Sequence, residues 1–221
     1  MNGVLVIIPV HNGSSTIVGL IRQFSRFPVH VLVVDDGSDD DTAKQARAAG
    51  AEVLSLPMRR GKGRALREGL ARALSSEPRP SWIVFSDGDG QHRPEELPRF
   101  LELMNDGCSL LLGSRMGNAE RFPSARRAAN VIGTRILRLM TGEQVPDTQC
   151  GYRAIRADLA QRLELESDGF EIETEMLLKS LLQGARWKAV PVSAVYNGER
   201  SHYRPVADTF RICMAALRYV R

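Results

Sequence analysis

The stretch Ile83–Glu95 reads Ile-Val-Phe-Ser-Asp-Gly-Asp-Gly-Gln-His-Arg-Pro-Glu. Its apolar beginning is typical of a buried strand, and Pro94 is typical of the first turn of a helix. Between the two stand a pair of carboxylates, Asp87 and Asp89, separated by Gly88. Open α/β sheets bind ligands at the carboxyl ends of their strands. The stretch therefore predicts a strand, a ligand-binding loop and a helix in succession.

The two carboxylates allow two interpretations. With Gln91 they form an all-oxygen set that suits Mg²⁺ or Mn²⁺. The alternative is an ordinary Asp-Gly turn. The stretch by itself is equally compatible with both, so the choice depends on the rest of the chain.

The composition is that of a globular protein with an unusual preference for arginine. The chain has 221 residues, 43% of them apolar and 25% charged, which fits one α/β domain. Of its 30 basic residues 4 are Lys and 26 are Arg, for a net charge of +4. Arginine favours bidentate contacts to phosphate and carboxylate, although an Arg-rich genome explains much of this. With 6% aromatic residues and none interleaved among the basic ones, we expect no nucleic-acid partner.

The cysteines and the N-terminal residues indicate the cellular compartment in which the protein is expected. Cys108, Cys150 and Cys213 are widely spaced and form no metal-binding pattern, which favours a reducing compartment. The chain begins directly in a strand-like run, Val4–Ile8, rather than in a signal-like segment. No stretch approaches the roughly 18 apolar residues of a transmembrane helix. We expect a cytoplasmic protein that is soluble or peripheral on the inner face of the cytoplasmic membrane.

The first half of the chain alternates between strand and helix patterns. Buried strands are predicted at residues 4–8, 29–34, 52–56, 81–85 and 109–112, with helices between them. This alternation predicts an α/β fold with a mostly parallel central sheet and helices on both faces. The polar loops at Asn12, Asp36 and Asp87 follow three of these strands. They should meet at one sheet edge as a nucleotide crevice.

The second half is less regular and rich in arginine. From Arg115 to Met140 there are six Arg and one Glu, mostly on a predicted helix at 124–140. A solvated helix face is one interpretation, but Arg200, His202 and Arg204 add a second basic cluster and favour an anion site. The polar motif Asp147–Arg153 precedes a predicted short helix, and a late strand is predicted at 187–195.

Two further motifs have alternative interpretations. Gly61-Lys62-Gly63 is not a phosphate loop, because Arg64 stands where that motif needs Ser or Thr. Its glycines either let the backbone approach a nucleotide or simply begin a helix. Asp36 either ends a strand in a turn or accepts hydrogen bonds from a base or ribose. The GxGxxG loop is absent, so we do not expect NAD or FAD.

The final segment, 205–221, has apolar residues on one helical face and basic residues on another. Packing against the domain is the simpler interpretation. Docking on an anionic membrane is the alternative, since basic amphipathic helices bind there.

Taken in order, these motifs resemble family 2 glycosyltransferases with the GT-A (Rossmann-like) fold, in particular polyprenyl-phosphate sugar synthases of the dolichyl-phosphate mannose synthase type. The matching stretches run nearly end to end: Ile8–Asn12, Val33–Ser38, Gly61–Gly63, Asp87–Glu95, Gly113–Arg115 and Asp147–Arg153.

The resemblance implies one domain in three parts: a nucleotide-binding half (1–114), an acceptor-binding half (115–204) and a C-terminal amphipathic helix (205–221). The implied residues for the nucleotide sugar are Pro9, His11, Asn12, Asp36, Gly61, Lys62, Asp87, Gly88 and Asp89. The implied ligands for Mg²⁺ or Mn²⁺ are Asp87, Asp89 and Gln91. The implied residues for the acceptor phosphate are Arg115, Arg127, Arg200 and Arg204. The implied catalytic residues are Asp147, Arg115 and Gln149.

The implied activity is metal-dependent, inverting transfer of a hexose from GDP-mannose or a UDP-sugar to a polyprenyl phosphate. A phosphate acceptor is already ionised and needs no base, whereas an alcohol acceptor needs one, for which Asp147 and Glu173 are candidates. Family members often continue into transmembrane helices, so we expect a membrane surface or a membrane-protein partner. The alternatives are a hydroxyl acceptor in glycolipid or polysaccharide synthesis, a nucleotidyltransferase, and a non-enzymatic nucleotide-sugar-binding or membrane-adaptor subunit.

Overall fold

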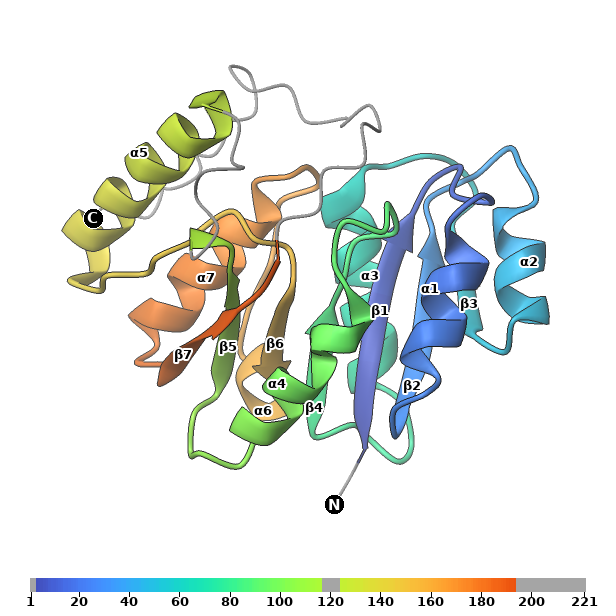
Figure 1. The fold of residues 1–221 in the computed structure, drawn as a ribbon, viewed down its shortest axis with the longest axis horizontal. Coiled ribbons are helices and arrows are strands. Elements are labelled where there is room, and N and C mark those ends of the chain that lie inside the picture. Colours follow the sequence, from blue (N-terminus) through green and yellow to red (C-terminus); the bar gives the residue numbers. More distant parts are fainter. Residues whose placement is uncertain (1–2, 117–123, 194–221) are drawn as a thin grey trace.

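The computed structural model describes residues 3–116 and 124–193, except for the side chains of 124–129. This part of the chain forms one seven-stranded sheet covered by helices (Figure 1). The strands are β1 (Val4–Val10), β2 (Val29–Asp35), β3 (Glu52–Ser55), β4 (Trp82–Phe85), β5 (Leu110–Ser114), β6 (Arg153–Arg156) and β7 (Trp187–Pro191). The helices are α1 (Ile17–Phe24), α2 (Thr42–Ala48), α3 (Lys62–Leu74), α4 (Leu97–Leu103), α5 (Ser124–Thr141), α6 (Ala157–Ala160) and α7 (Ile172–Leu182), with a 3₁₀ turn, η1, at Pro94–Glu96.

The strand order is β3-β2-β1-β4-β6-β5-β7. Neighbouring strands are parallel except where β6 pairs antiparallel with β4 and with β5. The expected α/β fold with a mostly parallel sheet is therefore confirmed. The four-residue strand β6 was not predicted, because the sequence analysis placed only a polar motif and a short helix there. Its strand conformation depends on hydrogen-bond partners on both sides, which come from distant parts of the chain.

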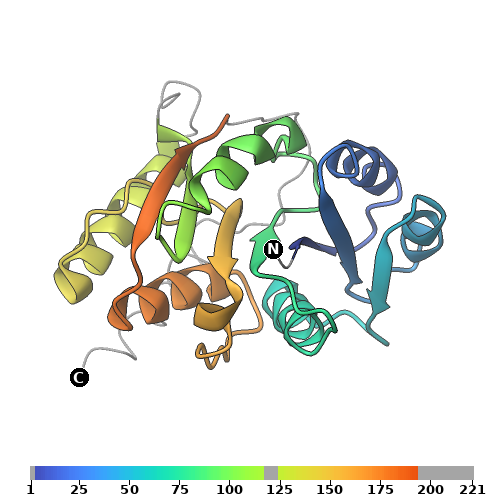
Figure 2. The ribbon, with the colours of Figure 1, turned by 90° about the horizontal axis from the view of Figure 1, so that it is seen from below.

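Helices lie on both faces of the sheet, as Figure 2 shows. Successive side chains of a strand point to opposite faces, and β1 feeds both cores in this way. Ile7 joins a cluster with residues of α3 and α7, whereas Val6 and Ile8 join a cluster with residues of α1 and α4. These two apolar layers fix the sheet and leave its loops free to carry the site.

Some predicted boundaries differ from the structure. Ser14 and Ser15 were expected to cap the first helix, but α1 follows Thr16, whose side chain makes no capping hydrogen bond to the helix. The Gly13 carbonyl instead accepts the N–H groups of Thr16 and Ile17, each at 3.0 Å. The last strand ends at Pro191 rather than at 195. The predicted helix at 205–221 lies outside the described residues.

Within the described ranges, none of the helices has both the length and the apolar character needed to cross a bilayer.

Candidate active site

The loops that follow β1, β2 and β4 meet at the carboxyl edge of the sheet. The Asp36 N–H donates to the Val10 carbonyl at 2.8 Å, which joins the loops after β1 and β2. The Thr16 hydroxyl donates to the Gly88 carbonyl at 2.7 Å, which joins the loops after β1 and β4. A Cβ atom at Gly88 would lie 3.0 Å from the Pro9 carbonyl oxygen, so this contact is already close. The structure thus brings the three loops of the expected crevice together, and their binding of a nucleotide stays a prediction.

Asp36 organises one side of this crevice. Its carboxylate accepts the backbone N–H groups of Arg60 at 2.7 Å and Gly61 at 2.8 Å. Its carbonyl oxygen lies 3.0 Å from Nδ1 of His11. Asp36 is buried, so it fixes the loop that precedes α3. Its direct contact with a base or ribose stays a prediction.

Asn12 connects the loops after β1 and β2 from the other side. Its N–H donates to Oγ of Ser38 at 2.8 Å, and its Oδ1 accepts the N–H of Asp39 at 2.9 Å. Its φ of 53° lies in the left-handed region, which Asn tolerates better than most residues. Asn12 therefore holds the open rim of the crevice in place.

A largely buried ion cluster lies just after the end of β4. Nζ of Lys62 is 2.5 Å from Oδ1 of Asp87 and 2.6 Å from Oε1 of Glu173. Burial alone would lower the pKa of Lys62, but the two carboxylates outweigh it and raise that pKa above its ordinary value. Burial would likewise raise the pKa of Asp87, and Lys62 reverses this and lowers it. Lys62 and Asp87 are therefore both charged at neutral pH.

Gly151 makes room for this cluster. A Cβ atom there would lie 2.8 Å from Oε1 of Glu173 and 2.9 Å from Oδ2 of Asp87. The motif Asp147–Arg153 thus packs directly beneath the carboxylates. The sequence analysis placed Gly151 in this motif without assigning it a role.

His92 is a second residue of this region that the sequence analysis quoted without a role. The N–H of Asp87 donates to its Nδ1 at 3.1 Å, so Nδ1 is an acceptor and Nε2 carries the proton. Burial lowers the pKa of His92 more than Asp87 raises it, which favours the neutral ring. The ring stacks on Tyr152 at 5.3 Å between centroids. Its position five residues after Asp87 is the sequence signal that could have identified it.

Asp89 and Gln91 occupy the exposed end of the same loop. Oδ1 of Asp89 accepts the N–H of Gln91 at 2.9 Å. Across the described part of the chain, no group of three or more His, Cys, Asp or Glu could hold a metal ion. Mg²⁺ is commonly held by one or two carboxylates together with substrate phosphates. Asp87 and Asp89 fit that kind of partial shell, with the remaining oxygens coming from a donor.

The glycines around Lys62 serve a contact within the protein. The N–H groups of Gly63 and Arg64 donate to the Asp168 carbonyl at 2.9 and 3.3 Å. A Cβ atom at Gly63 would lie 2.5 Å from the carbonyl carbon of Asp168. Of the two interpretations, the structure supports a helix start, at which a distant backbone segment caps α3.

Arg115 and Asp147 form a bidentate ion pair. Nε of Arg115 donates to Oδ2 at 2.8 Å and Nη2 donates to Oδ1 at 3.0 Å. The N–H groups of Arg115 and Gln149 donate to the same carboxylate at 3.2 and 3.1 Å. Burial would raise the pKa of Asp147, but Arg115 outweighs it and lowers the pKa. A carboxylate whose two oxygens both accept hydrogen bonds is poorly suited to act as a base. The bidentate pair instead fixes the orientation of the Arg115 guanidinium.

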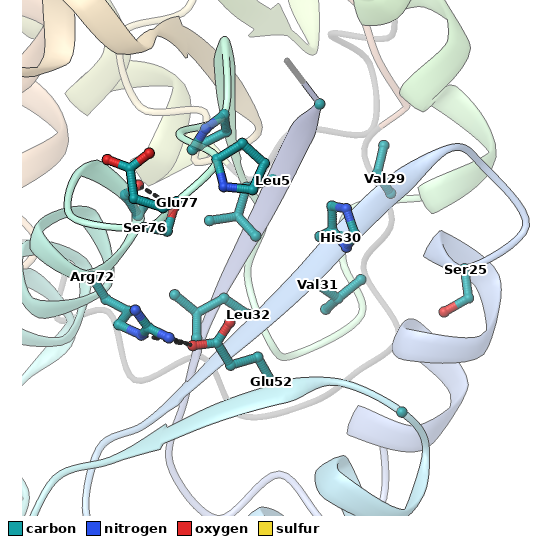
Figure 3. A pocket seen from close by; sticks show the side chains of 15 residues that line it. Leu5, Ser25, Val29, His30, Val31, Leu32, Glu52, Arg72, Ser76 and Glu77 are labelled. Carbon is teal, nitrogen blue, oxygen red and sulfur yellow. Dashed lines mark hydrogen bonds and ion pairs between the residues drawn. The ribbon is translucent and has the colours of Figure 1, made fainter. Parts of the chain in front are cut away.

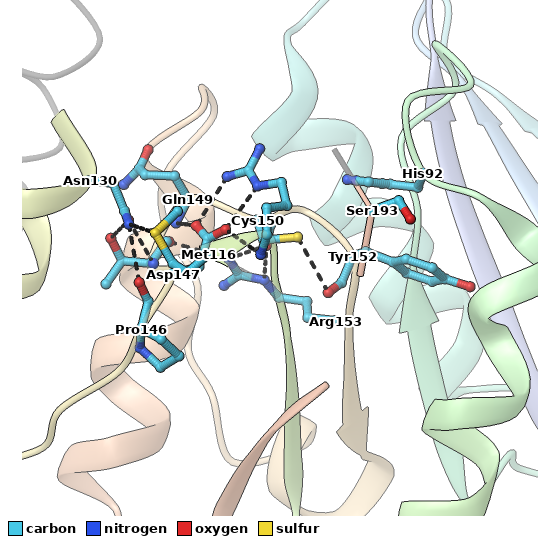
Figure 4. A network of polar contacts seen from close by, with 12 residues as sticks. His92, Met116, Asn130, Pro146, Asp147, Gln149, Cys150, Tyr152, Arg153 and Ser193 are labelled. Atoms are coloured by element: carbon cyan, nitrogen blue, oxygen red, sulfur yellow. Dashed lines mark hydrogen bonds and ion pairs between the residues drawn. The ribbon is translucent and has the colours of Figure 1, made fainter. Parts of the chain in front are cut away.

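The loop that carries Asp147 is held from α5 (Figure 4). Oδ1 of Asn130 accepts the N–H and the hydroxyl of Thr148 at 3.0 and 3.1 Å. Nδ2 of Asn130 donates to the Pro146 carbonyl at 3.1 Å. Beside this loop, the buried guanidinium of Arg153 donates to the carbonyls of Cys150 and Glu173. Neither Asn130 nor Arg153 was predicted as a site residue, because a single Asn or Arg in a sequence carries no such signal.

The two halves of the site are close enough to interact. The positive charge of Arg115 contributes to the lowered pKa of Asp87. The side chain of Gln149 reaches α7, where its Nε2 lies 3.5 Å from the hydroxyl of Thr174. The predicted acceptor residues Arg200 and Arg204, and the side chain of Arg127, lie outside the described residues.

Two cavities lie at different distances from the candidate active site. One of about 10 Å³, room for about one water, lies under the ion cluster and is lined by Pro9, Ser86, Asp87 and Glu173 among others. A larger one of about 440 Å³ lies at the amino ends of β1 and β2 and is lined by residues such as Leu5 and His30 (Figure 3). In it the charges of Arg72 and Glu52 already satisfy each other at 2.7 Å. The larger cavity is on the wrong edge of the sheet for the predicted site.

The fold agrees with the comparison with known families. The family model described as glycosyl transferase family 2 matches residues 5–164. The chain belongs to this family and is a glycosyltransferase, which confirms the family predicted from the motifs.

Several named relatives and one solved structure are similar to this chain over most of its length. The chain is 34% identical to an undecaprenyl-phosphate mannosyltransferase of Micrococcus luteus, over 87% of this chain and 83% of the relative. It is 30% identical to a polyprenol monophosphomannose synthase of Mycolicibacterium smegmatis, over 86% of this chain and 76% of the relative. Among solved structures, glucosyl-3-phosphoglycerate synthase of Mycobacterium tuberculosis, in complex with Mn²⁺, uridine diphosphate and phosphoglyceric acid, superposes with a TM-score of 0.74. At 22% identity over 98% of this chain and 78% of that one, this likeness shows the fold.

Proposed function

We propose that this glycosyltransferase moves a hexose from a nucleoside-diphosphate sugar to a polyprenyl phosphate, with inversion at the anomeric carbon. The observation that carries the proposal is the state of the two candidate bases. Asp147 is held on both oxygens by Arg115, and Glu173 is held by the ammonium of Lys62. An acceptor that brings its own ionised oxygen fits such a site better than an alcohol, which would need a free base.

In this proposal the nucleotide sugar lies across the carboxyl edge of the sheet. Residues Pro9 to Asn12 and Asp36 shape the pocket for the base and ribose, and the loop at Asp87–Asp89 faces the diphosphate. A divalent cation on Asp87 and Asp89 would neutralise the charge that grows on the β-phosphate as it leaves. The relatives that are named as mannosyltransferases make GDP-mannose the first donor to test.

The chain's own cations provide further stabilisation of charge. Lys62 and Arg115 are fixed by carboxylates of the protein before a substrate arrives, and preorganised charge of this kind is effective in catalysis. An oxygen of the acceptor phosphate attacks C1 of the sugar, and the bond from C1 to the β-phosphate oxygen breaks. The nucleoside diphosphate leaves with the electron pair. Asp147 and Gln149 act in this scheme by placing Arg115 and the loop next to the sugar.

The same proposal assigns the parts of the chain. Residues 1–114 bind the nucleotide, 115–204 bind the acceptor, with Arg115, Arg127, Arg200 and Arg204 facing its phosphate, and 205–221 form an amphipathic helix. Because a polyprenyl phosphate resides in a bilayer, the enzyme works at a membrane surface, on the cytoplasmic face where nucleotide sugars are available.

The direct test is transfer from GDP-mannose to a polyprenyl phosphate in the presence of Mg²⁺ or Mn²⁺, with a UDP-hexose as the second donor. We expect lipid-linked sugar and free nucleoside diphosphate in equal amounts. Asp89→Asn should lower the rate by about 100-fold or more, because it removes charge next to the leaving phosphate. Asp106→Asn, which changes an exposed carboxylate that pairs with Lys188 just before β5, is the matched control.

Two results would contradict the proposal. Full activity of Asp89→Asn with Mg²⁺ or Mn²⁺ would remove the metal role. Release of pyrophosphate in place of nucleoside diphosphate would identify a nucleotidyltransferase.

A further inference from the structure

The outer face of α5 exposes large apolar side chains. Val131 is 43% exposed, Ile132 45% and Leu139 87%. These are three of the five large hydrophobic side chains that are exposed in the described part of the chain. Scattered exposed apolar residues are normal, but a group on one helix marks a contact surface.

Two arginines share this face with the apolar side chains. Arg135 and Arg138 are exposed, and residues three or four apart on a helix are neighbours. Val131, Arg135 and Arg138 therefore line up, with Ile132 and Leu139 beside them. The ion pairs between described residues do not include either arginine. We call these five residues the α5 outer face.

The orientation of α5 is fixed by its other side. Asn130 and Leu137 are buried, and a Cβ atom at Gly133 would lie 3.0 Å from the hydroxyl of Thr148. These residues pack the helix on the loop at Pro146–Gln149 and on α7, and the helix lies at the outside of the molecule (Figure 1). The α5 outer face consequently points away from the described body of the protein.

We infer that the α5 outer face docks on the surface of an anionic bilayer. Basic amphipathic helices bind there, because apolar side chains enter the interface and arginines meet anionic head groups. A second copy of the chain fits less well, since a two-fold contact would bring the arginines of both copies together. The inference rests in part on the proposed function, which places the acceptor in a membrane.

The position of this face relative to the site supports the inference. Asn130, on the inner side of the same helix, holds the loop that carries Asp147. Asp147 in turn holds Arg115. A bilayer under the α5 outer face would thus lie beside the part of the site proposed to receive a lipid phosphate.

The test measures co-flotation of the full chain with vesicles that contain no polyprenyl phosphate, either phosphatidylcholine alone or with 30% phosphatidylglycerol. We expect Arg135→Gln/Arg138→Gln to weaken binding to the anionic vesicles on the order of tenfold, with less salt dependence. Leu139→Gln should also weaken binding, by about fivefold. The controls are Arg22→Gln/Arg26→Gln and Leu182→Gln, which change exposed side chains outside α5.

Unchanged vesicle binding in both α5 variants, or equal losses in the controls, would overturn the inference. So would a change in oligomeric state on size-exclusion chromatography, which would assign the face to a second copy. Transfer to a short-chain, water-soluble prenyl phosphate separates this inference from the proposed function. It should be unaffected by the α5 substitutions. If the wild type bound vesicles but did not transfer sugar to the short-chain acceptor, the proposed function would be wrong and the docking surface would still stand.

Discussion

At the scale of single residues, the site consists of charges that are neutralised within the protein. Lys62 forms ion pairs with both Asp87 and Glu173, and Arg115 forms an ion pair with Asp147. Buried charges are costly unless they are paired, so these side chains hold one another in place without a ligand. Asp89 lies at the exposed end of the same loop, where the proposed donor and its cation would bind.

The pairing of Asp147 makes the stability of the protein depend on acid pH. The ordinary pKa of this carboxyl is 3.8, and Arg115 lowers the pKa in the folded protein. Above pH 3.8 the ionised carboxylate contributes its full stabilisation. As the pH falls below that value, the unfolded chain takes up the proton first and the free energy of unfolding decreases. We expect urea midpoints to fall between pH 4 and pH 2.5.

The comparison variant is Asp147→Asn, which keeps the shape of the side chain and removes the titration. Its midpoints should be lower than those of the wild type at pH 7 and should change less with acid. An equal slope in the two proteins would show that Asp147 is not the group responsible. Asp158→Asn, which alters an exposed pair with Arg156, should reduce the slope less than Asp147→Asn does, because solvent screens an exposed pair.

At the scale of elements, α3 begins where a distant backbone segment approaches it. The Asp168 carbonyl accepts the N–H groups of Gly63 and Arg64, two of the donors that a helix start leaves unpaired. Arg67 then fixes the same segment through the Asp168 carboxylate at 2.8 Å. This capping places Lys62, the first residue of α3, between Asp87 in the loop after β4 and Glu173 of α7.

A methyl group at position 63 should break this contact. Gly63→Ala would place a Cβ atom 2.5 Å from the Asp168 backbone, so the segment has to move. We expect the free energy of unfolding to fall by about 1–3 kcal/mol, as in other overpacked sites. Activity should also fall because Lys62 shifts. Urea unfolding and the transfer assay measure the two effects.

The chain offers an opposite control in α1. A Cβ atom at Gly19 would meet nothing within 4 Å, and Ala is the better helix former by about 1 kcal/mol. Gly19→Ala should therefore stabilise the protein by about 0.5–1 kcal/mol and leave transfer unchanged. If the two substitutions had the same effect, the Asp168 contact would not account for the glycine at position 63.

At the scale of the whole molecule, the site joins the parallel part of the sheet to the region around β6. The Asp36 and Asp87 loops follow β2 and β4, while Arg115 follows β5 and the Asp147 loop precedes β6. Because β6 runs antiparallel between β4 and β5, the loop before it arrives at the same edge as the loops after β4 and β5. A diphosphate bound at this edge would touch both parts.

Binding across both parts should stabilise the whole molecule. A ligand that binds only the folded state at 100 times its Kd adds about 2.7 kcal/mol. For a domain of this size that is a rise in Tm of roughly 5–10 °C. We expect this shift with a nucleoside diphosphate and Mn²⁺, measured by thermal unfolding.

The corresponding nucleoside monophosphate is the control, because it keeps the base and ribose and lacks the β-phosphate. The monophosphate should raise the Tm clearly less than the diphosphate does. Chelation of Mn²⁺ should reduce the rise in Tm caused by the diphosphate but not the rise caused by the monophosphate. Equal shifts with both nucleotides would place the diphosphate elsewhere than on the loop at Asp87–Asp89.

The sequence by itself determined the parallel part of the sheet and predicted the edge at which we propose that the ligand binds. Apolar runs such as Val4–Ile8 bury themselves whatever their partners, and the polar residues that follow them must then lie at the strand ends. The ordered motifs also determined the family. Local patterns of this kind depend on neighbours along the chain, so they can be read without a structure.

Only the tertiary structure decided which charges meet. The pairs Lys62–Glu173 and Arg115–Asp147 join residues 111 and 32 positions apart, and no local pattern specifies such contacts. The same holds for β6, for the Asn130 link and for the capping of α3 by Asp168. Each depends on where folding brings distant backbone segments together. The residues proposed to carry the chemistry were thus recognisable in the sequence, but the packing decided how they pair, and this pairing leaves Asp147 bonded to Arg115 through both of its oxygens.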